Sequence, residues 1–269
     1  MPAFRQPAER LRAGALDLRD HLRGGRQPLV PPRRLSAEVG SGDFAEVGRD
    51  FFELFRRAGL AAGDDVLDVG CGAGRMARPL AGWLQGRYEG FDVQARAISW
   101  CERNYGAHPN FHFLHVDVAN DAYNAGGRAE AAGLSFPYPD QSFDFAIVTS
   151  VFTHMMGDAV HRYLGELARV VRPAGTVFAT WLLLDREVET ALAETRTALE
   201  LPEHGLDPSL GSVRLASRET PSAAIAFDLD AVAAAYVSAG FGLAEHWPGG
   251  WAGRARAPTW QDVLTAVRA

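Results

Sequence analysis

The sequence contains no lysine, only two cysteines and no long uninterrupted apolar run. All 27 basic side chains are therefore arginines, which we interpret as a coding bias, given the many alanines and glycines, and not as an arginine-specific function. Cys71 and Cys101 cannot make a disulfide framework, and their spacing is not that of metal ligands. No apolar stretch approaches the roughly 18 residues of a membrane helix, and the N-terminus shows no signal-peptide pattern. We therefore expect a soluble cytoplasmic protein with no membrane partner.

The charge of the chain gives no general attraction to nucleic acid. Its net charge is -6 at pH 7 and its pI is near 5.8, and it has no basic, aromatic-rich surface pattern, so we expect no nucleic-acid partner. Residues 1–35 differ from the rest, with eight arginines against three acids. Leu11, Ala15, Leu18 and Leu22 predict a helical arm, which a Pro-rich connector follows. This arm packs either on its own domain or on a second subunit of a homodimer, and binding of an anionic ligand is the alternative.

Strands and helices alternate through residues 36–269 and predict one α/β domain. Expected strands lie at 65–70, 87–92, 111–116, 143–149 and 175–182, and expected helices at 43–60, 74–85, 94–104 and 158–170. This rhythm is typical of a doubly wound parallel sheet, which binds ligands beyond the carboxyl ends of its strands. Residues 185–227 interrupt this alternation of strands and helices, and their first part predicts a helix to about residue 200. We interpret them as a lid insertion over the carboxyl ends of the strands. A helix at 228–239 and strands at 241–247 and 260–267 complete the domain.

A glycine loop follows the first expected strand in VLDVGCGAGRM, residues 66–76. Gly70, Gly72 and Gly74 suit a tight strand-to-helix turn that holds an adenosine-containing cofactor. A dinucleotide fingerprint needs a third glycine where Arg75 stands, because helix and strand must pack closely beneath a pyrophosphate. The loop therefore favours a cofactor without a pyrophosphate.

Three carboxylates lie at or near the ends of three successive strands. Asp68 precedes the loop and would face a positive amino group, whereas a pyrophosphate would be repelled. Asp92 ends the second strand, where an acidic side chain accepts hydrogen bonds from ribose hydroxyls. Asp117 ends the third strand and can accept from an adenine amine. Ammonium, ribose and adenine are three parts of one molecule.

These motifs resemble those of the class I S-adenosylmethionine (SAM)-dependent methyltransferases. VLDVGCGAGR is similar to their first motif, YEGFDVQ to their second and FLHVDVAN to their third. FPYPDQSFDFAIVTSVFTHM resembles the fourth-strand region, and ELARVVRPAGTVFAT the approach to strand five. The resemblance covers residues 62–182. It implies a Rossmann-like, mostly parallel, seven-stranded sheet whose last two strands form a C-terminal antiparallel hairpin.

The resemblance also implies roles for individual residues toward SAM. Those that would cradle its methionine part are Asp68, Gly70, Gly72 and Gly74, with Ser150 near them. Asp92 would hold the ribose, and Val93 or Gln94 would lie beside the adenine. Asp117 and the Val118 amide would bind the adenine edge. Each glycine could instead serve only as a tight turn, and each carboxylate as a helix cap or a solvated strand end.

The catalytic candidates follow strands four and five. His154 could act as general base toward an oxygen nucleophile, or it could orient a loop or touch the cofactor. Asp185 is the second candidate base. No acidic cluster follows either strand, so we expect no metal. Trp181 and Trp251 either shape an apolar acceptor pocket or belong to the core.

The absence of one sequence motif restricts the class of methyl acceptor. TSVFTHM stands where a D/N-P-P-Y/F tetrapeptide would indicate methylation of amino groups on DNA bases or protein. A small molecule is therefore the expected acceptor. VPPRRLSAEVGSGDFAEVG before the core and GGWAGRARAPTWQDVLTAV at the end resemble small-molecule methyltransferases of glycan and natural-product pathways. This resemblance implies O-methylation at a hydroxyl of a sugar-like or secondary-metabolite acceptor. The alternatives are a non-catalytic SAM-binding protein and a SAM-fold enzyme with chemistry other than methyl transfer. A short-chain dehydrogenase is excluded, because its Tyr-x-x-x-Lys motif needs a lysine.

Overall fold

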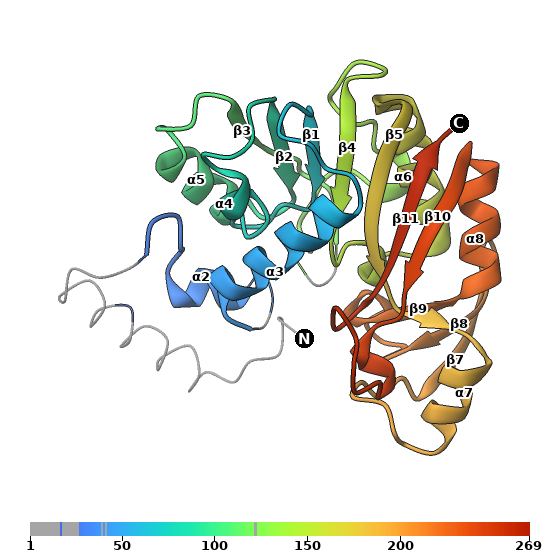
Figure 1. The fold of residues 1–269 in the computed structure, drawn as a ribbon. Helices are drawn as coiled ribbons and strands as arrows, with labels where there is room; N and C mark the ends of the chain where they lie inside the picture. The colour runs from blue at the N-terminus through green and yellow to red at the C-terminus, as the bar shows by residue number, and fades with distance from the viewer. Residues whose placement is uncertain (1–16, 18–26, 39, 41, 121–122) are drawn as a thin grey trace.

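The computed structural model describes residues 17, 27–38, 40, 42–120 and 123–269. A seven-stranded sheet forms its centre, in the order β10-β11-β5-β4-β1-β2-β3 (Figure 1). Its strands are β1 (Val66–Val69), β2 (Tyr88–Asp92), β3 (Phe111–His115), β4 (Phe143–Val148), β5 (Val171–Trp181), β10 (Phe241–Trp247) and β11 (Asp262–Arg268). The first five are parallel, and β11 runs antiparallel to both β5 and β10. The predicted fold class, with its C-terminal hairpin, is confirmed.

Helices cover both faces of this sheet, because successive residues of the central strands are buried on both sides. On one face lie α3 (Phe44–Arg57), α4 (Ala77–Leu80) and α5 (Ala95–Asn104), packed with strand residues such as Val66 and Tyr88. On the other lie α6 (Gly157–Val170) and α8 (Leu229–Ser238), packed with residues such as Leu67 and Val69. Successive residues of β1 therefore belong to different cores, and Asp68 belongs to the α3–α5 side.

Two elements outside the 185–227 insertion have a bound that differs by four or more residues from the sequence prediction. The helix expected at 74–85 shrinks to α4, because left-handed glycines bracket it: φ is +77° at Gly74 and +84° at Gly82. Strand β5 begins at Val171, four residues before the expected start. Its first part is irregular, since Phe143 pairs with Val171 but Phe145 pairs with Thr176.

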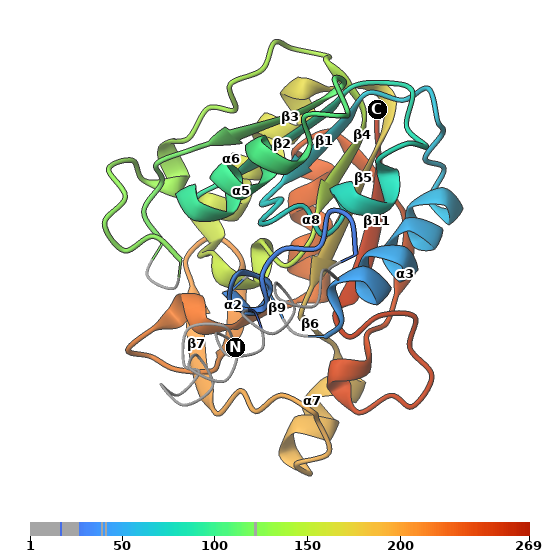
Figure 2. The same ribbon diagram turned by 90° about the vertical axis from the view of Figure 1, so that its left-hand side faces the viewer.

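A second, four-stranded sheet, which the sequence did not predict, follows β5. Its order is β6-β9-β8-β7, from β6 (Leu183–Leu184), β7 (Glu203–Asp207), β8 (Gly211–Leu215) and β9 (Ile225–Asp228). Helix α7 (Arg186–Ala193) follows β6 and ends well before the expected residue 200, and a short 3-10 helix, η3 (Pro221–Ala223), precedes β9. Figures 1 and 2 place this sheet at the end of the main sheet where β4 and β5 finish. The insertion at 185–227 thus lies at the ligand end, although its action as a lid stays a prediction.

The N-terminal segment reaches the same end of the molecule. Helix α2 (Arg33–Glu38) lies level with the second sheet in both views (Figures 1 and 2). The carboxylate of Asp17 accepts a hydrogen bond from the Arg33 amide at 2.7 Å, at the start of this helix. Most of the predicted arm falls on residues 1–16 and 18–26, outside the described residues, so its helix and its homodimer contact stay predictions. No helix in the described part of the chain is long and apolar enough to cross a membrane.

Candidate functional site

The glycine loop turns sharply from β1 toward α4. Gly70, Gly72 and Gly74 adopt left-handed φ values of +73°, +54° and +77°, which side-chain-bearing residues rarely take. The amide of Gly70 donates to the Phe91 carbonyl at 2.8 Å, which holds the loop against the end of β2. A Cβ atom on Gly70 would lie 2.5 Å from a methyl group of Val151. The residues after β4 therefore pack directly against this loop.

Arg75, in the position of the missing third glycine, points away from the loop. Its guanidinium donates to the Gly40 carbonyl at 3.0 Å and lies 5.3 Å from the centre of the Phe44 ring. The side chain thus joins the loop to the segment that precedes α3. A glycine at this position would lose both contacts. Arg75 therefore has a structural role in addition to any effect on the choice of cofactor.

Asp92 connects the loop to the end of β2. One carboxylate oxygen accepts from the Gly72 amide at 2.8 Å, and the other from the Gln94 amide at 2.7 Å. Burial raises the pKa of this carboxyl, against the lowering effect of both amides. Because a carboxylate oxygen accepts more than one hydrogen bond, each oxygen retains capacity for a ribose hydroxyl. The carboxylate of Asp92 therefore fits a ribose, and Val93 and Gln94 follow Asp92 directly in the chain.

Asp68 lies on β1, two residues before the first loop glycine, and its contact with the amino group of a cofactor stays a prediction. Its side chain is fully buried, and one oxygen accepts from the Tyr88 hydroxyl at 2.5 Å. The other oxygen has no hydrogen-bond partner among the described residues. Burial raises its pKa to about 7, although the Tyr88 bond acts in the opposite direction. The side chain points inward because Asp68 shares its face of β1 with the α3–α5 core.

Asp117 is held by its own loop, two residues beyond β3. Its carboxylate accepts from Arg128 at 2.5 Å and from Asn124 at 3.2 Å. The hydrogen bond from Arg128 lowers its pKa, as does that from Asn124. The backbone of Val118 pairs with Ala129 in an isolated bridge. Both residues lie at the predicted edge of the site, and their contact with adenine stays a prediction.

His154 ends η2 (Phe152–His154), the short 3-10 helix after β4, and contacts two loops. Its Nδ1 lies 2.7 Å from the Ser222 carbonyl, and its Nε2 lies 3.3 Å from the Tyr123 hydroxyl. Since a carbonyl only accepts, Nδ1 carries the proton and Nε2 accepts from Tyr123. Burial lowers the pKa of the imidazole. The side chain is thus a neutral histidine whose basic nitrogen is covered by a tyrosine.

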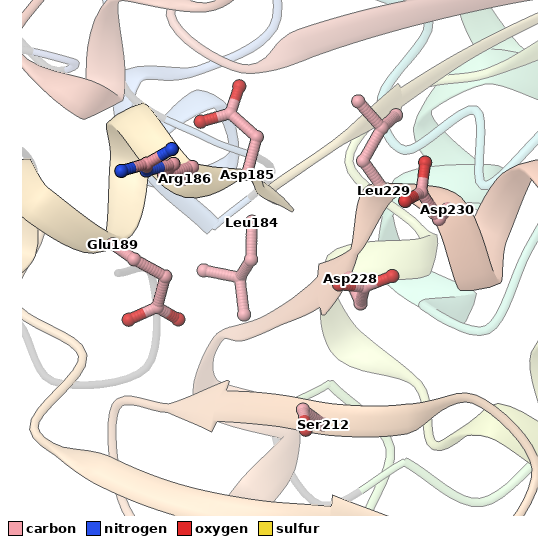
Figure 3. Close-up of a pocket in the computed structure, with 8 residues that line it drawn as sticks. All are labelled: Leu184, Asp185, Arg186, Glu189, Ser212, Asp228, Leu229 and Asp230. Atoms are coloured by element: carbon pink, nitrogen blue, oxygen red, sulfur yellow. The ribbon is translucent and has the colours of Figure 1, made fainter.

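Asp185 lies in a different environment. It is the N-cap of α7, where its carboxylate accepts from the Val188 amide at 2.8 Å, and Arg254 lies 3.5 Å away. Figure 3 shows it at one wall of a pocket of about 270 Å³ within the insertion. The residues that line this pocket are Leu184, Asp185, Arg186, Glu189, Ser212, Asp228, Leu229 and Asp230. None of the predicted cofactor-binding residues is among them, and the helix cap explains Asp185 without catalysis.

Ser150 follows β4 and has an exposed side chain. Its φ of +58° is left-handed, and its amide donates to the Thr180 hydroxyl at 2.7 Å. The tryptophans considered for an acceptor pocket belong to the core, since Trp181 and Trp251 are fully buried.

Sequence reasoning missed Tyr123 at this site. It lies five residues after Val118, in a polar segment without periodicity, and only its contact with His154 distinguishes it. A tyrosine shortly after the third strand-end motif was the sole available signal.

Comparison with known proteins matches residues 67–179 to a family described as a methyltransferase domain. A sterol 24-C-methyltransferase of Eremothecium gossypii is 29% identical over 61% of this chain and 40% of its own length. An O-methyltransferase of Aspergillus sclerotiorum, resE, is 28% identical over 56% of this chain and 52% of its own length. The chain spans about half the length of the curated relatives it matches.

Solved structures share the fold over most of the chain at low identity. The crystal structure of the [4+2]-cyclase SpnF matches 82% of this chain and 80% of its own, with a TM-score of 0.53 and 18% identity. The same fold is thus found in a protein named as a cyclase, so the chemistry must be argued from the residues of the site.

Proposed function

We propose that this chain, which belongs to the class I SAM-dependent methyltransferase family, moves a methyl group from SAM to a hydroxyl of a small molecule. The observation that carries this proposal is the contact between Asp92 and Gly72. It brings the acid at the end of β2 and the left-handed glycine loop after β1 into one surface. An adenosine cofactor without a pyrophosphate fits that surface.

The family's cofactor supplies an activated methyl group, and the chain would mainly align its transfer. We propose that the loop glycines and Ser150 lie along the methionine part, and that Asp92 binds the ribose hydroxyls. Val93 or Gln94 would lie beside the adenine, and Asp117 and the Val118 amide at its edge. Asp68, whose second carboxylate oxygen has no partner among the described residues, would face the amino group of the methionine part.

His154 remains our proposed general base, and Tyr123 becomes the group through which it acts. An acceptor hydroxyl that gives its proton to the Tyr123 oxygen would let the phenol proton pass to Nε2. The low pKa of His154 keeps that nitrogen free of a proton near neutral pH. Asp185 is the weaker candidate, since its carboxylate already caps α7.

We propose that the acceptor atom is an oxygen. The two relatives act, by name, at a sterol carbon and at an oxygen, so both chemistries occur among similar domains. We favour oxygen because a neutral histidine and a tyrosine suit removal of a hydroxyl proton. We further propose that the acceptor is sugar-like or a secondary metabolite, and that the protein is cytoplasmic and forms a homodimer. We also propose that the chain consists of an N-terminal arm and one domain, in which residues 185–227 move as a lid.

A second candidate function is chemistry other than methyl transfer on the same fold. It is suggested by the cyclase that shares this fold. The two differ in their products. Methyl transfer adds one CH2 to the mass of the acceptor and releases S-adenosylhomocysteine, whereas a cyclisation leaves the mass unchanged.

The first test is a calorimetric titration with S-adenosylhomocysteine, with NAD as the comparison ligand. We expect binding of the first only. Asp92→Ala should weaken that binding by about 1–3 kcal/mol because ribose hydroxyls lose their partner. Asp140→Ala, at an exposed position beside Arg169, is the matched control. Equal binding by Asp92→Ala and wild type would contradict the placement of the ribose. If S-adenosylhomocysteine binds, the next experiment is a mass-spectrometric screen for the acceptor.

A further inference from the structure

A hydrogen-bonded polar cluster joins β4, β5 and β11 at the ligand end of the main sheet. The Thr180 hydroxyl accepts from the Ser150 amide at 2.7 Å and donates to Oε1 of Gln261 at 2.5 Å. Because the Thr180 hydrogen is used there, the carboxamide turns Nε2 toward the residues after β4. Nε2 donates to the Ser150 hydroxyl at 3.1 Å and lies 3.4 Å from the Thr153 hydroxyl.

The backbone of Gln261 is fixed on both sides. A Cβ atom on Gly249 would lie 2.4 Å from the Gln261 carbonyl carbon, so only a glycine leaves room for this backbone. The next residue, Asp262, is buried and accepts from the Leu183 amide, the Gly249 amide and the Trp251 indole at 2.6–2.9 Å. The carboxamide is therefore presented from a rigid base.

The cluster presents one unused donor, on Ser150, and one donor engaged only in a long hydrogen bond, on Gln261. Ser150 accepts from Gln261, so its own hydroxyl hydrogen is available, and its side chain is exposed. The second Nε2 hydrogen of Gln261 makes only the long contact with Thr153. Ser150 also has a left-handed φ, and backbone strain of this kind is concentrated at functional sites. Val151, next in the chain, packs on the cofactor loop.

We propose that Gln261 is a specificity-determining residue: with Ser150 it binds the hydroxyl oxygen of the acceptor at the boundary between acceptor and cofactor. This inference rests on the proposed function and names the side chains that select the acceptor. The acceptor oxygen accepts from the Ser150 hydroxyl and from Nε2. A site built around two donors discriminates against a molecule that lacks the oxygen, because the donors are then left unpaired.

The test measures binding of two probes to protein saturated with S-adenosylhomocysteine. The probes are 4-methylanisole and cyclohexanone, whose oxygens accept hydrogen bonds but cannot donate them. They are compared with toluene and cyclohexane, which lack the oxygen, by ligand-observed NMR. In wild type we expect each oxygen-bearing probe to bind about tenfold more tightly than its hydrocarbon. Gln261→Glu retains the size of the side chain and the bond from Thr180 but loses both Nε2 donors. It should reduce that preference at least fivefold, as should Ser150→Ala.

Gln141→Glu is the matched control, because it makes the same chemical change at an exposed position before β4. It should leave the preference unchanged. The dissociation constant of S-adenosylhomocysteine separates the possible failures. If wild type does not bind it, the proposed function fails. If all variants bind it normally and Gln261→Glu retains the preference, or wild type shows none, the inference is overturned. An equal loss of S-adenosylhomocysteine binding in Gln261→Glu would instead make Gln261 a cofactor residue and also overturn it.

Discussion

At the scale of single residues, the tautomer of His154 decides what the histidine can do. The Ser222 carbonyl fixes the proton on Nδ1, so only Nε2 can receive one, and Tyr123 covers it. His154→Ala should lower turnover roughly 10²-fold if the imidazole is the base. Tyr123→Phe should also lower turnover, because a phenyl ring cannot relay the proton.

The kinetic readout is kcat against pH for both variants, with His161→Ala, on the exposed side of α6, as control. Because burial lowers the pKa of His154, the neutral, active form persists below pH 6.5, and wild-type activity should fall only at lower pH. Normal turnover in His154→Ala would remove the assignment as base. Faster turnover in Tyr123→Phe would mean that the tyrosine only blocks Nε2.

Asp68 is the second residue with a measurable signature. Its pKa rises from 3.8 to about 7 on burial, so the folded state retains a proton that the unfolded state releases between these values. Stability should therefore fall as pH rises from about 4 to about 7 and then become constant. The rise in pKa corresponds to about 4 kcal/mol at most.

Asp68→Asn carries no titrating group, so it should lose this dependence. The difference in unfolding free energy between the variant and wild type, from urea titrations at pH 5 and pH 8, should shift by 1–4 kcal/mol in favour of the variant at pH 8. A pH-independent difference would mean that Asp68 is not protonated in the folded protein near pH 5.

At the scale of elements, patterns confined to one strand were predictable and long-range contacts were not. The first four strands lie within one residue of their expected bounds, and in the first three a Gly or Asp marks the end of the run. Gly70 and Asp92 were recognisable from their places in such runs. Gln261 lies 111 residues from Ser150, and Tyr123 lies 31 residues from His154, so only the fold brings these pairs together.

The second sheet escaped prediction for a local reason. Strand β7 reads EHGLD and β8 reads GSVRL, and neither shows the continuous apolar run of the central strands. Both are half-exposed and antiparallel, and they gain their order from pairing with each other and with β9. A hairpin of this kind can be predicted only when the strands that pair with it are known.

Asp207, at the end of β7, links this hairpin to the main fold. One carboxylate oxygen accepts from the Gly157 amide at 2.8 Å, at the start of α6, and the other accepts from Ser209 and Leu210. A Cβ atom on Gly157 would lie 2.2 Å from this carboxylate. The insertion therefore supplies a helix cap from 50 residues away in the chain.

Asp207→Ala should lower the free energy of unfolding by about 1–3 kcal/mol, because three buried or part-buried amides lose their acceptor. Asp43→Ala removes a cap that lies beside its own helix, α3, and should cost about 1 kcal/mol. Urea titration of both variants gives the comparison. A loss for Asp207→Ala no larger than a few tenths of a kcal/mol would show that the insertion is not fastened at this point.

At the scale of the whole molecule, the two sheets share one hydrophobic core. Val213, Ile225 and Phe227 of the second sheet pack in the same buried cluster as Leu67 of β1 and Val148 of β4. The insertion cannot detach without exposing that cluster, and the bonds from Asp207 and Ser222 hold it in addition. We therefore expect residues 36–269 to unfold as one cooperative unit, and the proposed lid motion to involve loops and not the sheet.

Scanning calorimetry tests this expectation together with the cofactor. Wild type should show one transition whose calorimetric and van't Hoff enthalpies agree. S-adenosylhomocysteine at a hundred times its dissociation constant should stabilise the folded state by about 2.7 kcal/mol, and the whole transition should move up by roughly 5–10 °C. NAD at the same concentration should leave it in place. Because the core is shared, a ligand at the glycine loop must also stabilise the second sheet. Two transitions, of which only one responds to S-adenosylhomocysteine, would contradict the shared core and make the insertion a separate unit.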